Sequence, residues 1–468
     1  MKQLPNIVFI LMDDMGWRDL GCAGSTFYET PNLDRLASQG MMFTQAHAAC
    51  PVCSPTRASL LTGKYPARLG VTDWIDHGDF HPCRGAVIDA PYVKHLDTAE
   101  HSLARALRGA GYATWHVGKW HLGKEPHWPE KHGFDINIGG CEIGSPWRRG
   151  YFSPWGIPTL SDGPDGAYLP DRLTDEAIRL IENRDPAKPF FLNFWDYCVH
   201  TPIQAKPEKV EACKRRAAAL GLDKLDALVE GGFFPCGHKR GQRVTRRVVQ
   251  SDPAYAAMIE SVDENIGRLL AALDAQGAAD NTLVIFTSDN GGLSTAEGSP
   301  TCNLPLAEGK GWMYDGGTRE PLLIRFPGVV AGGGVCHEPV TSPDFYPTIL
   351  DAAGLPPIPW QHVDGVSFLP LLRGDPSFKR GAIFWHYPHY GNQGGTPGGA
   401  VREGDWKLIE FFEDNRLELY NLRDDPGESA NRVHTHGETA ARLHALLVKW
   451  RAEVSAKMPE RNPGWAAE

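Results

Sequence analysis

Hydrophobic and polar positions along the chain alternate between two repeating patterns. Short runs of β-branched and apolar residues, such as Ile7 to Met12, are typical of strands buried on both faces of a parallel sheet. Longer segments with apolar residues at helical spacing separate these runs, and Tyr255 to Leu273 is the clearest of them. We therefore expect helices over 102–112, 173–181 and 255–273, and strands over 7–12, 113–117, 190–195 and 283–286. This alternation predicts a doubly wound α/β domain with a central, mostly parallel sheet.

The pattern changes near residue 372. Three short strand candidates, 382–387, 406–412 and 417–421, precede a closing helix over 438–450. We therefore expect a large α/β domain over residues 1–372 and a smaller C-terminal α+β domain over 373–468 with a small antiparallel sheet. Two stretches, 140–170 and 206–250, look irregular and outside the core.

Composition and charge exclude several classes of protein. The 468 residues carry 47 basic and 57 acidic side chains, a net charge of −10, which argues against a nucleic-acid partner. Neither a signal peptide nor a membrane-spanning run is visible, so we expect no membrane partner and a cytoplasmic protein, or an exported one if a leader was trimmed. The ten cysteines are too sparse for a disulfide scaffold, and most are expected to be small buried hydrophobes.

Polar residues follow the predicted strands at the points where each strand ends. Asp13 and Asp14 follow the first strand, Asp289 and Asn290 follow the strand over 283–286, and His200 comes shortly after the strand over 190–195. In open α/β sheets ligands bind at such carboxyl ends. Alone, each of these residues is as well explained by a turn or a solvated surface.

The most specific motif is Cys53-Ser-Pro-Thr-Arg57. It resembles the signature of the formylglycine-dependent sulfatases of the alkaline phosphatase superfamily, in which this cysteine is oxidised to an aldehyde. Five further motifs appear in that family's order: Asp13-Asp14, Gly118-Lys-Trp-His-Leu-Gly123, His200-Thr-Pro202, Ser288-Asp-Asn-Gly291 and Glu308-Gly-Lys-Gly311. The resemblance covers nearly the whole chain and implies an alkaline-phosphatase-like α/β sandwich.

The resemblance also implies a role for each matching residue. Cys53, after conversion to formylglycine (3-oxoalanine) by a maturation enzyme, is the nucleophile, with Arg57 beside it. Lys119 and Lys310 hold sulfate oxygens, His121 acts as a base and His200 as the acid for the leaving alcohol, with Lys310. The metal ligands are Asp13, Asp14, Cys53, Asp289 and Asn290, and such an oxygen-rich set fits Ca²⁺ better than Zn²⁺.

The predicted reaction is hydrolysis of a sulfate ester on a saccharide. The family resemblance implies a sulfated saccharide substrate, a sulfate of galactose or N-acetylgalactosamine, with O4 as the expected position. Phosphate or phosphonate ester hydrolysis on the same scaffold is the rival reaction, and a non-catalytic, calcium-dependent glycan-binding protein is the rival class. Cys50 and Cys53 also form a Cys-x-x-Cys, but the surrounding pattern of a thiol redox domain is missing.

Weaker signals concern substrate binding. Trp147, Arg148, His386 and His389 are candidates for saccharide contacts, because aromatics stack on sugars and His or Arg bind hydroxyls. Basic residues crowd the insert at Lys239, Arg240, Arg243, Arg246 and Arg247. Such a run is usually a solvated face, and the alternative is that it steers an anionic glycan.

Overall fold

The computed structural model describes residues 4–76, 84–375 and 378–465 and is built on a nine-stranded sheet. The strand order is β11–β2–β10–β9–β1–β6–β4–β5, with β12 beside β2. The strands are β1 (Asn6–Met12), β2 (Met41–His47), β4 (Ala113–Gly118), β5 (Ile136–Ile138), β6 (Phe190–Trp195), β9 (Thr282–Ser288), β10 (Arg319–Arg325), β11 (Gly334–Cys336) and β12 (Val340–Thr341). β1 is parallel to β6 and β9, whereas β10 is antiparallel to β9 and β2. The expected mostly parallel sheet is confirmed.

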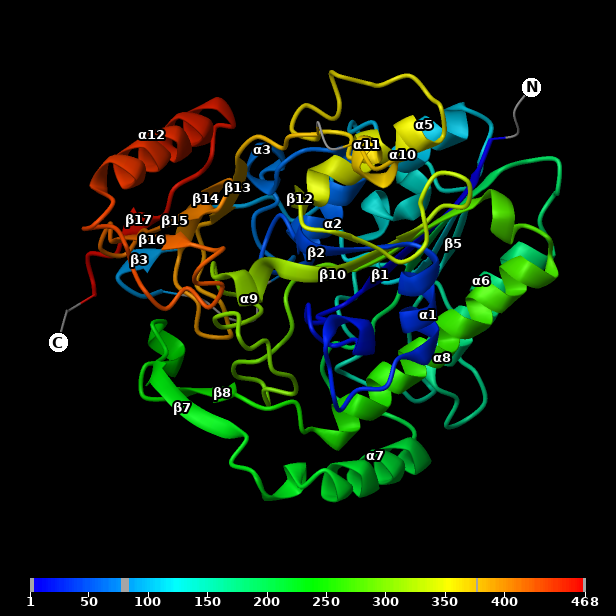
Figure 1. Cartoon of the computed structure of the whole chain (residues 1–468), viewed down its shortest axis with the longest axis horizontal. Helices are drawn as coiled ribbons and strands as arrows, with labels where there is room; N and C mark the ends of the chain where they lie inside the picture. Colours follow the sequence, from blue (N-terminus) through cyan, green and yellow to red (C-terminus); the bar gives the residue numbers. More distant parts are fainter. Residues whose placement is uncertain (1–3, 77–83, 376–377, 466–468) are drawn as a thin grey trace.

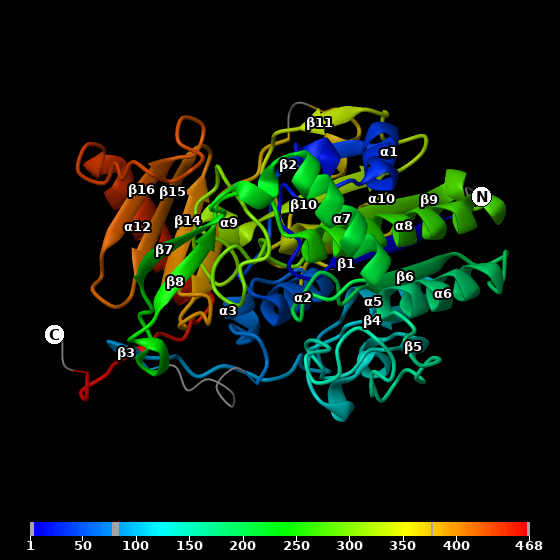
Figure 2. The same ribbon diagram turned by 90° about the horizontal axis from the view of Figure 1, so that it is seen from below.

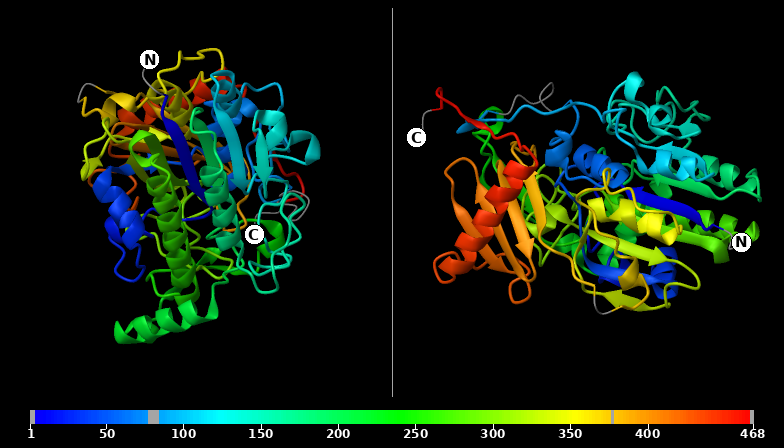
Figure 3. Two further views of the ribbon diagram at one scale, coloured as in Figure 1. Left: turned by 90° about the vertical axis from the view of Figure 1, so that its right-hand side faces the viewer. Right: turned by 90° about the horizontal axis from the view of Figure 1, so that it is seen from above.

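Helices cover both faces of this sheet (Figures 1 and 3). One face carries α1 (Pro31–Gln39), α6 (Leu169–Glu182) and α8 (Pro253–Ala275), and the other carries α2 (Cys53–Thr62), α5 (Leu103–Gly109), α10 (Phe345–Ala352) and α11 (Leu369–Leu372). β1 is apolar on both sides because its alternate side chains enter the two cores: Val8, Ile10 and Met12 on the α8 side, and Ile7, Phe9 and Leu11 on the α2 side.

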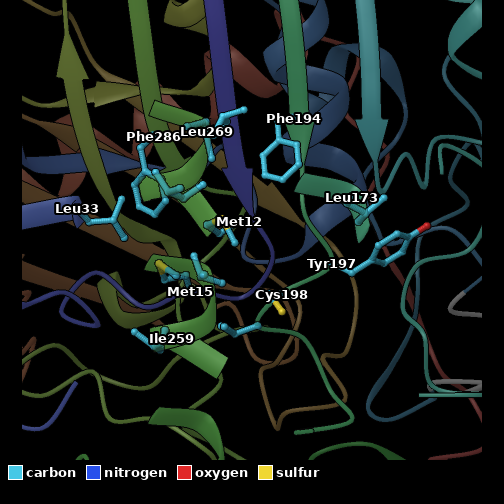
Figure 4. Close-up of a cluster of buried hydrophobic side chains, with 14 of the residues drawn as sticks. Met12, Met15, Leu33, Leu173, Phe194, Tyr197, Cys198, Ile259, Leu269 and Phe286 are labelled. Atoms are coloured by element: carbon cyan, nitrogen blue, oxygen red, sulfur yellow. The ribbon is translucent and has the colours of Figure 1, made fainter. Parts of the chain in front are cut away.

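Packing of the hydrophobic core fixes the positions of the carboxyl ends of the strands. Figure 4 shows Met12, Phe194 and Phe286 from three neighbouring strands in one cluster with Ile259 and Leu269 of α8. These side chains are buried, so the ends of β1, β6 and β9 are held at one level. The polar residues that follow them therefore meet at one edge of the sheet.

A second sheet lies at one end of the molecule (Figures 1 and 2). It is antiparallel, in the order β13 (Ile383–Tyr387), β14 (Gly398–Glu403), β15 (Trp406–Phe411) and β16 (Leu417–Asn421). One face packs under α12 (Gly437–Glu453), and the other packs against Cys50 and Val52, directly before α2. The small sheet thus supports the turn that leads to Cys53.

Three sequence-based expectations need correction. Residues 140–170 are not outside the core, because Tyr151, Trp155 and Leu160 are buried in the core cluster on the α8 side of the sheet. Residues 206–250 are not irregular throughout, because they form α7 (Pro207–Ala219) and a hairpin of β7 (Leu228–Phe233) and β8 (Arg243–Arg247). α7 presents only a narrow apolar face, with Cys213 and Ala217 buried, so its many charges hide the helical pattern. β14 escaped prediction because it begins with Gly398 and Gly399, which read as a turn.

The remaining elements are short. α3 (Pro66–Leu69) follows α2, α9 (Asp315–Thr318) precedes β10, and β3 (Val87–Ile88) pairs with β17 (Glu460–Arg461). Cys83 lies outside the described residues, and the nine cysteines within them are all free thiols. Among the helices of the described residues, none is long and apolar enough to cross a membrane.

A buried ion cluster joins the two sheets. Lys407 of β15 donates to Asp315 of α9 at 2.8 Å and lies 2.9 Å from Glu428, and all three side chains are fully buried. Burial alone would raise the pKa of Asp315, but Lys407 and Arg319 hold it well below its usual range. Burial, opposed by Lys407, raises the pKa of Glu428 to about 7.

Removing the central cation should therefore weaken the fold. We expect Lys407→Met to lower the free energy of unfolding by about 3–5 kcal/mol, because it leaves Glu428 buried without its cation and Asp315 with Arg319 alone. The matched control is Arg442→Met in the exposed pair with Glu403, where the loss should stay below about 1 kcal/mol. Urea unfolding of both variants measures the difference, and equal losses would contradict the role given to Lys407.

Candidate active site

Cys53 is the first residue of α2 and lies almost completely buried at the positive end of the helix. The preceding Val52 is extended, and the helix ends at Gly63 in the left-handed conformation at φ 67°. Sγ of Cys53 lies 3.4 Å from Nδ1 of His121. The thiol therefore faces both a helix N-terminus, which favours anions, and an imidazole that can take a proton.

Two carboxylates lie close to the Cys53 side chain, and a third carboxylate and an amide lie beside these two. Asp13 and Asp14 follow β1, and Asp289 and Asn290 follow the adjacent parallel strand β9. Ligand atoms of Asp13, Cys53 and Asp289 all lie within 4.8 Å of one another. Asp14 has a left-handed backbone, φ 64°, and its N–H donates to Oδ1 of Asp289 at 3.2 Å. This turn directs both aspartates of the first motif into one cluster.

Three cations from separate segments neutralise these carboxylates. Arg57, one turn along α2 from Cys53, lies 2.7 Å from Asp289. Lys119, after β4, donates to Asp13 at 2.6 Å. Lys310, in the loop after β9, donates to Asp14 at 2.8 Å.

Burial and the neighbouring charges shift the pKa values within this cluster. Burial, opposed by Lys119, raises the pKa of Asp13 well above its ordinary value. Burial would also raise the pKa of Asp14, but Lys310 and His200 outweigh it and lower that pKa. Burial raises the pKa of the Cys53 thiol, so unmodified Cys53 is neutral at pH 7 and a poor nucleophile.

The two histidines have different proton arrangements. Burial lowers the pKa of His121 well below its usual value, and the positive charges of Lys119 and Arg57 lower it further. The imidazole is therefore neutral and can accept a proton. Burial and then Lys310 lower the pKa of His200 to about 3. Nδ1 of His200 pairs with the carbonyl of Thr201 at 2.8 Å, and Nε2 lies 2.9 Å from Nζ of Lys310. The hydrogen bonds therefore assign the shared proton to Lys310.

The donor set fits a hard divalent cation. Oδ1 of Asp13 and Oδ1 of Asn290 are buried without a hydrogen-bond partner among the described residues, and both belong to the cluster of oxygen donors. Unpaired buried oxygens are costly, and a cation that binds 6–8 oxygens would satisfy them. The residues predicted as metal ligands are thus brought together with free donor atoms.

Residues outside the predicted motifs complete the surroundings of His121. Nε2 of His121 lies 3.2 Å from the carbonyl of Ile75, and Ser54 accepts from the Ile75 N–H at 3.2 Å while donating to the His121 carbonyl. A β-carbon on Gly144 would lie 2.4 Å from Cε1 of His121, so this loop covers the imidazole closely. No local motif marks Ile75 or Gly144, so sequence reasoning missed them.

The four residues predicted to contact the saccharide do not lie together in one environment. Trp147 is exposed, and the guanidinium of Arg148 stacks over its ring on the loop that passes His121. His386 is buried and pairs with the carbonyl of Lys457 at 2.8 Å. His389 is buried between Asp73 and Asp89.

The loop that carries Lys310 is linked by an ion pair to the insert over residues 206–250. Arg246 of β8 donates through Nε to Glu308 at 3.0 Å and forms a second contact through Nη2. The Glu308 carbonyl accepts from Ser294 at 2.7 Å, and its backbone is left-handed at φ 58°. At least one residue of the basic insert is therefore an ion-pair partner of the site loop rather than a solvated charge.

The fold and these motifs match known proteins. A family model described as Sulfatase matches residues 5–355, and one described as the C-terminal part of N-sulphoglucosamine sulphohydrolase matches residues 308–453. Human N-acetylgalactosamine-6-sulfatase is 35% identical over 456 residues, which cover 93% of this chain and 77% of the relative. N-acetylglucosamine-6-O-sulfatase of Bacteroides thetaiotaomicron is 28% identical over 517 residues, covering 95% of this chain and 85% of the relative.

Solved structures agree with the sequence matches. The crystal structure of Ps i-CgsB in complex with k-i-k-neocarrahexaose superposes with a TM-score of 0.76 at 28% identity, covering 100% of this chain and 95% of that one. The family model spans most of the chain, and the human relative is similar over nearly all of it. The chain therefore belongs to the sulfatase family and is a hydrolase of sulfuric esters.

Proposed function

We propose that this sulfatase removes sulfate from a saccharide, with Cys53 converted to formylglycine and Ca²⁺ bound at Asp13, Asp14, Asp289 and Asn290. The observation that carries the proposal is the position of Cys53. Its side chain lies at a helix N-terminus, within 4.8 Å of ligand atoms of Asp13 and Asp289 and 3.4 Å from the neutral base His121. Among the described cysteines, Cys53 alone lies in a group of side chains that could hold a metal ion.

The metal and the converted cysteine would each supply one part of the chemistry. Bound to the oxygen cluster, Ca²⁺ would draw negative charge from the sulfate oxygens as a Lewis acid. A hydrated aldehyde at residue 53 offers one hydroxyl that attacks sulfur and a second whose collapse releases sulfate. The proposal therefore requires a maturation enzyme that acts on Cys53.

The chain's own residues position the ester and move protons. Lys119 pairs with Asp13 and Lys310 pairs with Asp14, and both ammonium groups can hold sulfate oxygens. His121, neutral and next to residue 53, accepts the proton of the hydroxyl that collapses. Lys310 holds the proton that, through its contact with His200, is available to the departing alcohol.

The saccharide and the ester position rest on similarity. One relative is named an N-acetylgalactosamine-6-sulfatase and the other an N-acetylglucosamine-6-O-sulfatase, which favours O6. The resemblance seen in the sequence favours O4 of galactose or N-acetylgalactosamine. Both positions therefore belong in the test.

A panel of defined esters tests the proposal. We expect sulfate release from at least one of the 4- and 6-sulfates of galactose and N-acetylgalactosamine, and faster turnover of an aryl sulfate than of the aryl phosphate or phosphonate. Intact mass of the Cys53 peptide is recorded on the same sample. Preference for phosphate or phosphonate would overturn the proposal, and so would absence of turnover by fully converted protein, which would favour a glycan-binding role.

Cys53→Ser is the matched test of the nucleophile. Serine has a single hydroxyl and cannot expel the product, so we expect multiple turnover to be abolished while calcium binding is nearly unchanged. Cys50→Ala removes a buried thiol three residues away and should keep turnover. Sustained wild-type rates in the serine variant would refute the mechanism.

His200→Ala tests the protonation of the leaving group. We expect a fall of about 10²–10⁴-fold on saccharide sulfates, whose alcohols leave poorly, and a much smaller fall on nitrophenyl sulfate. The ratio of kcat/KM for the two substrates measures the effect. Equal losses on both would remove His200 from this step.

Gly144→Ala tests the placement of His121. The new β-carbon would lie 2.4 Å from the imidazole and displace it from Cys53, so kcat should fall by about 10²-fold on all substrates. Gly241→Ala is the control, because its β-carbon meets nothing within 4 Å. An unchanged kcat in Gly144→Ala would show that the loop gives way without moving His121.

A further inference from the structure

Three side chains from distant segments converge beside the active site without being part of it. Asp73 lies between α3 and β3, Asp89 follows β3, and His389 follows β13 of the small sheet. Their ligand atoms all lie within 4.8 Å of one another. Nδ1 of His389 is 3.9 Å from Oδ2 of Asp73 and 3.8 Å from Oδ2 of Asp89.

The proton arrangement of His389 leaves one nitrogen directed at the carboxylates. Nε2 lies 2.9 Å from Oγ1 of Thr72, whereas Nδ1 is buried and has no hydrogen-bond partner among the described residues. If Nε2–H donates to Thr72, the lone pair of Nδ1 points toward two negative groups. That contact is repulsive, and a cation between the three atoms would relieve it.

A proton alone fits the distances poorly. Charge-assisted hydrogen bonds between an imidazolium and a carboxylate close to about 2.7–2.9 Å, yet neither carboxylate approaches Nδ1 closer than 3.8 Å. Adjacent ligands of a tetrahedral zinc ion lie roughly 3.3 Å apart, so each contact of His389 with a carboxylate would have to close by about 0.5–0.6 Å. The spacing therefore suits a small ion better than a shared proton.

We propose that Asp73, Asp89 and His389 bind a divalent transition-metal ion, with Zn²⁺ as the expected metal. One imidazole and two carboxylates are typical zinc ligands, whereas the Asp13 cluster offers mainly oxygens and suits calcium. Thr72 fixes the orientation of the ligating histidine through its other ring nitrogen, as outer partners of metal-bound histidines commonly do.

The ion would fasten one wall of the active site to the small sheet. Two residues after Asp73, Ile75 pairs through its carbonyl with His121. The segments that carry the other two ligands, Asp89 and His389, are already joined by hydrogen bonds. The N–H of Tyr390 donates to the Asp89 side chain at 3.1 Å, and the N–H of Ala90 donates to the Pro388 carbonyl at 3.3 Å. Zinc would add a direct bond between these segments and thereby support the placement of His121.

Metal counting tests the proposal without any need for turnover. The full chain is stripped with a chelator, saturated with Ca²⁺, and titrated with Zn²⁺ by calorimetry, and the metals retained after gel filtration are counted by elemental analysis. We expect about one zinc per chain, with calcium retained at the other cluster. Failure of the sulfatase proposal would not alter this count.

Four variants locate the ion. His389→Gln and Asp89→Asn each remove a direct zinc ligand and should weaken zinc binding by about 100-fold or more. Loss of a residue that only supports a ligand typically weakens binding by about 10–100-fold. Tyr390→Phe changes a neighbouring hydroxyl that bonds Glu413 and should keep zinc, and Asp289→Asn should lose calcium but keep zinc. Circular dichroism checks that the variants are folded.

Two results would overturn the proposal. The first is absence of stoichiometric zinc in the wild-type protein. The second is unchanged zinc affinity in folded His389→Gln and Asp89→Asn. A raised KM for the sulfated saccharide in these two variants, alongside that second result, would assign the cluster to substrate hydroxyls.

Discussion

The structure depends on the cost of burying several carboxylates together. Asp13, Asp14 and Asp289 end two adjacent parallel strands in a region without solvent, where like charges repel strongly. Each is matched by a cation from a different part of the fold, and the pairs are Asp13 with Lys119, Asp14 with Lys310, and Asp289 with Arg57. The first turn of α2, the end of β4 and the loop after β9 must therefore all reach the same edge of the sheet. This requirement links the sequence motifs, which lie far apart in the chain, into one arrangement.

The same balance explains how a protein with a net charge of −10 can bind an anionic ester. The three carboxylates and three cations cancel, so a bound divalent cation would give the cluster a positive charge close to the helix N-terminus at Cys53. Attraction of the ester is thus local and independent of the net charge. Lys119 and Lys310 are held by carboxylates rather than by solvent, so in the proposed site they would lose little conformational entropy on binding sulfate oxygens.

Much of this arrangement was predictable because it follows from runs of residues. The apolar run at β1 predicts a strand buried on both faces, and the acids after it predict a ligand site at the edge of the sheet. Gly144, Ile75 and Asp73 could not be found this way, because each acts through a contact between segments distant in sequence. α7 and β14 were missed for a related reason: charges and glycines dominate their local pattern, and packing against α8 and β15 decides their structure.

The charged insert over residues 206–250, whose role the sequence leaves open, is linked to the loop that carries Lys310 by the ion pair of Arg246 with Glu308. Burial, opposed by Arg246, raises the pKa of Glu308, so this carboxylate depends on the guanidinium of β8 for its charge. Glu308 occupies a left-handed position two residues before Lys310, and Lys310 contacts both Asp14 and His200. A displacement of the β7–β8 hairpin would therefore reach Lys310 through three consecutive residues. Arg246 is thus constrained by its ion pair with the loop that carries Lys310.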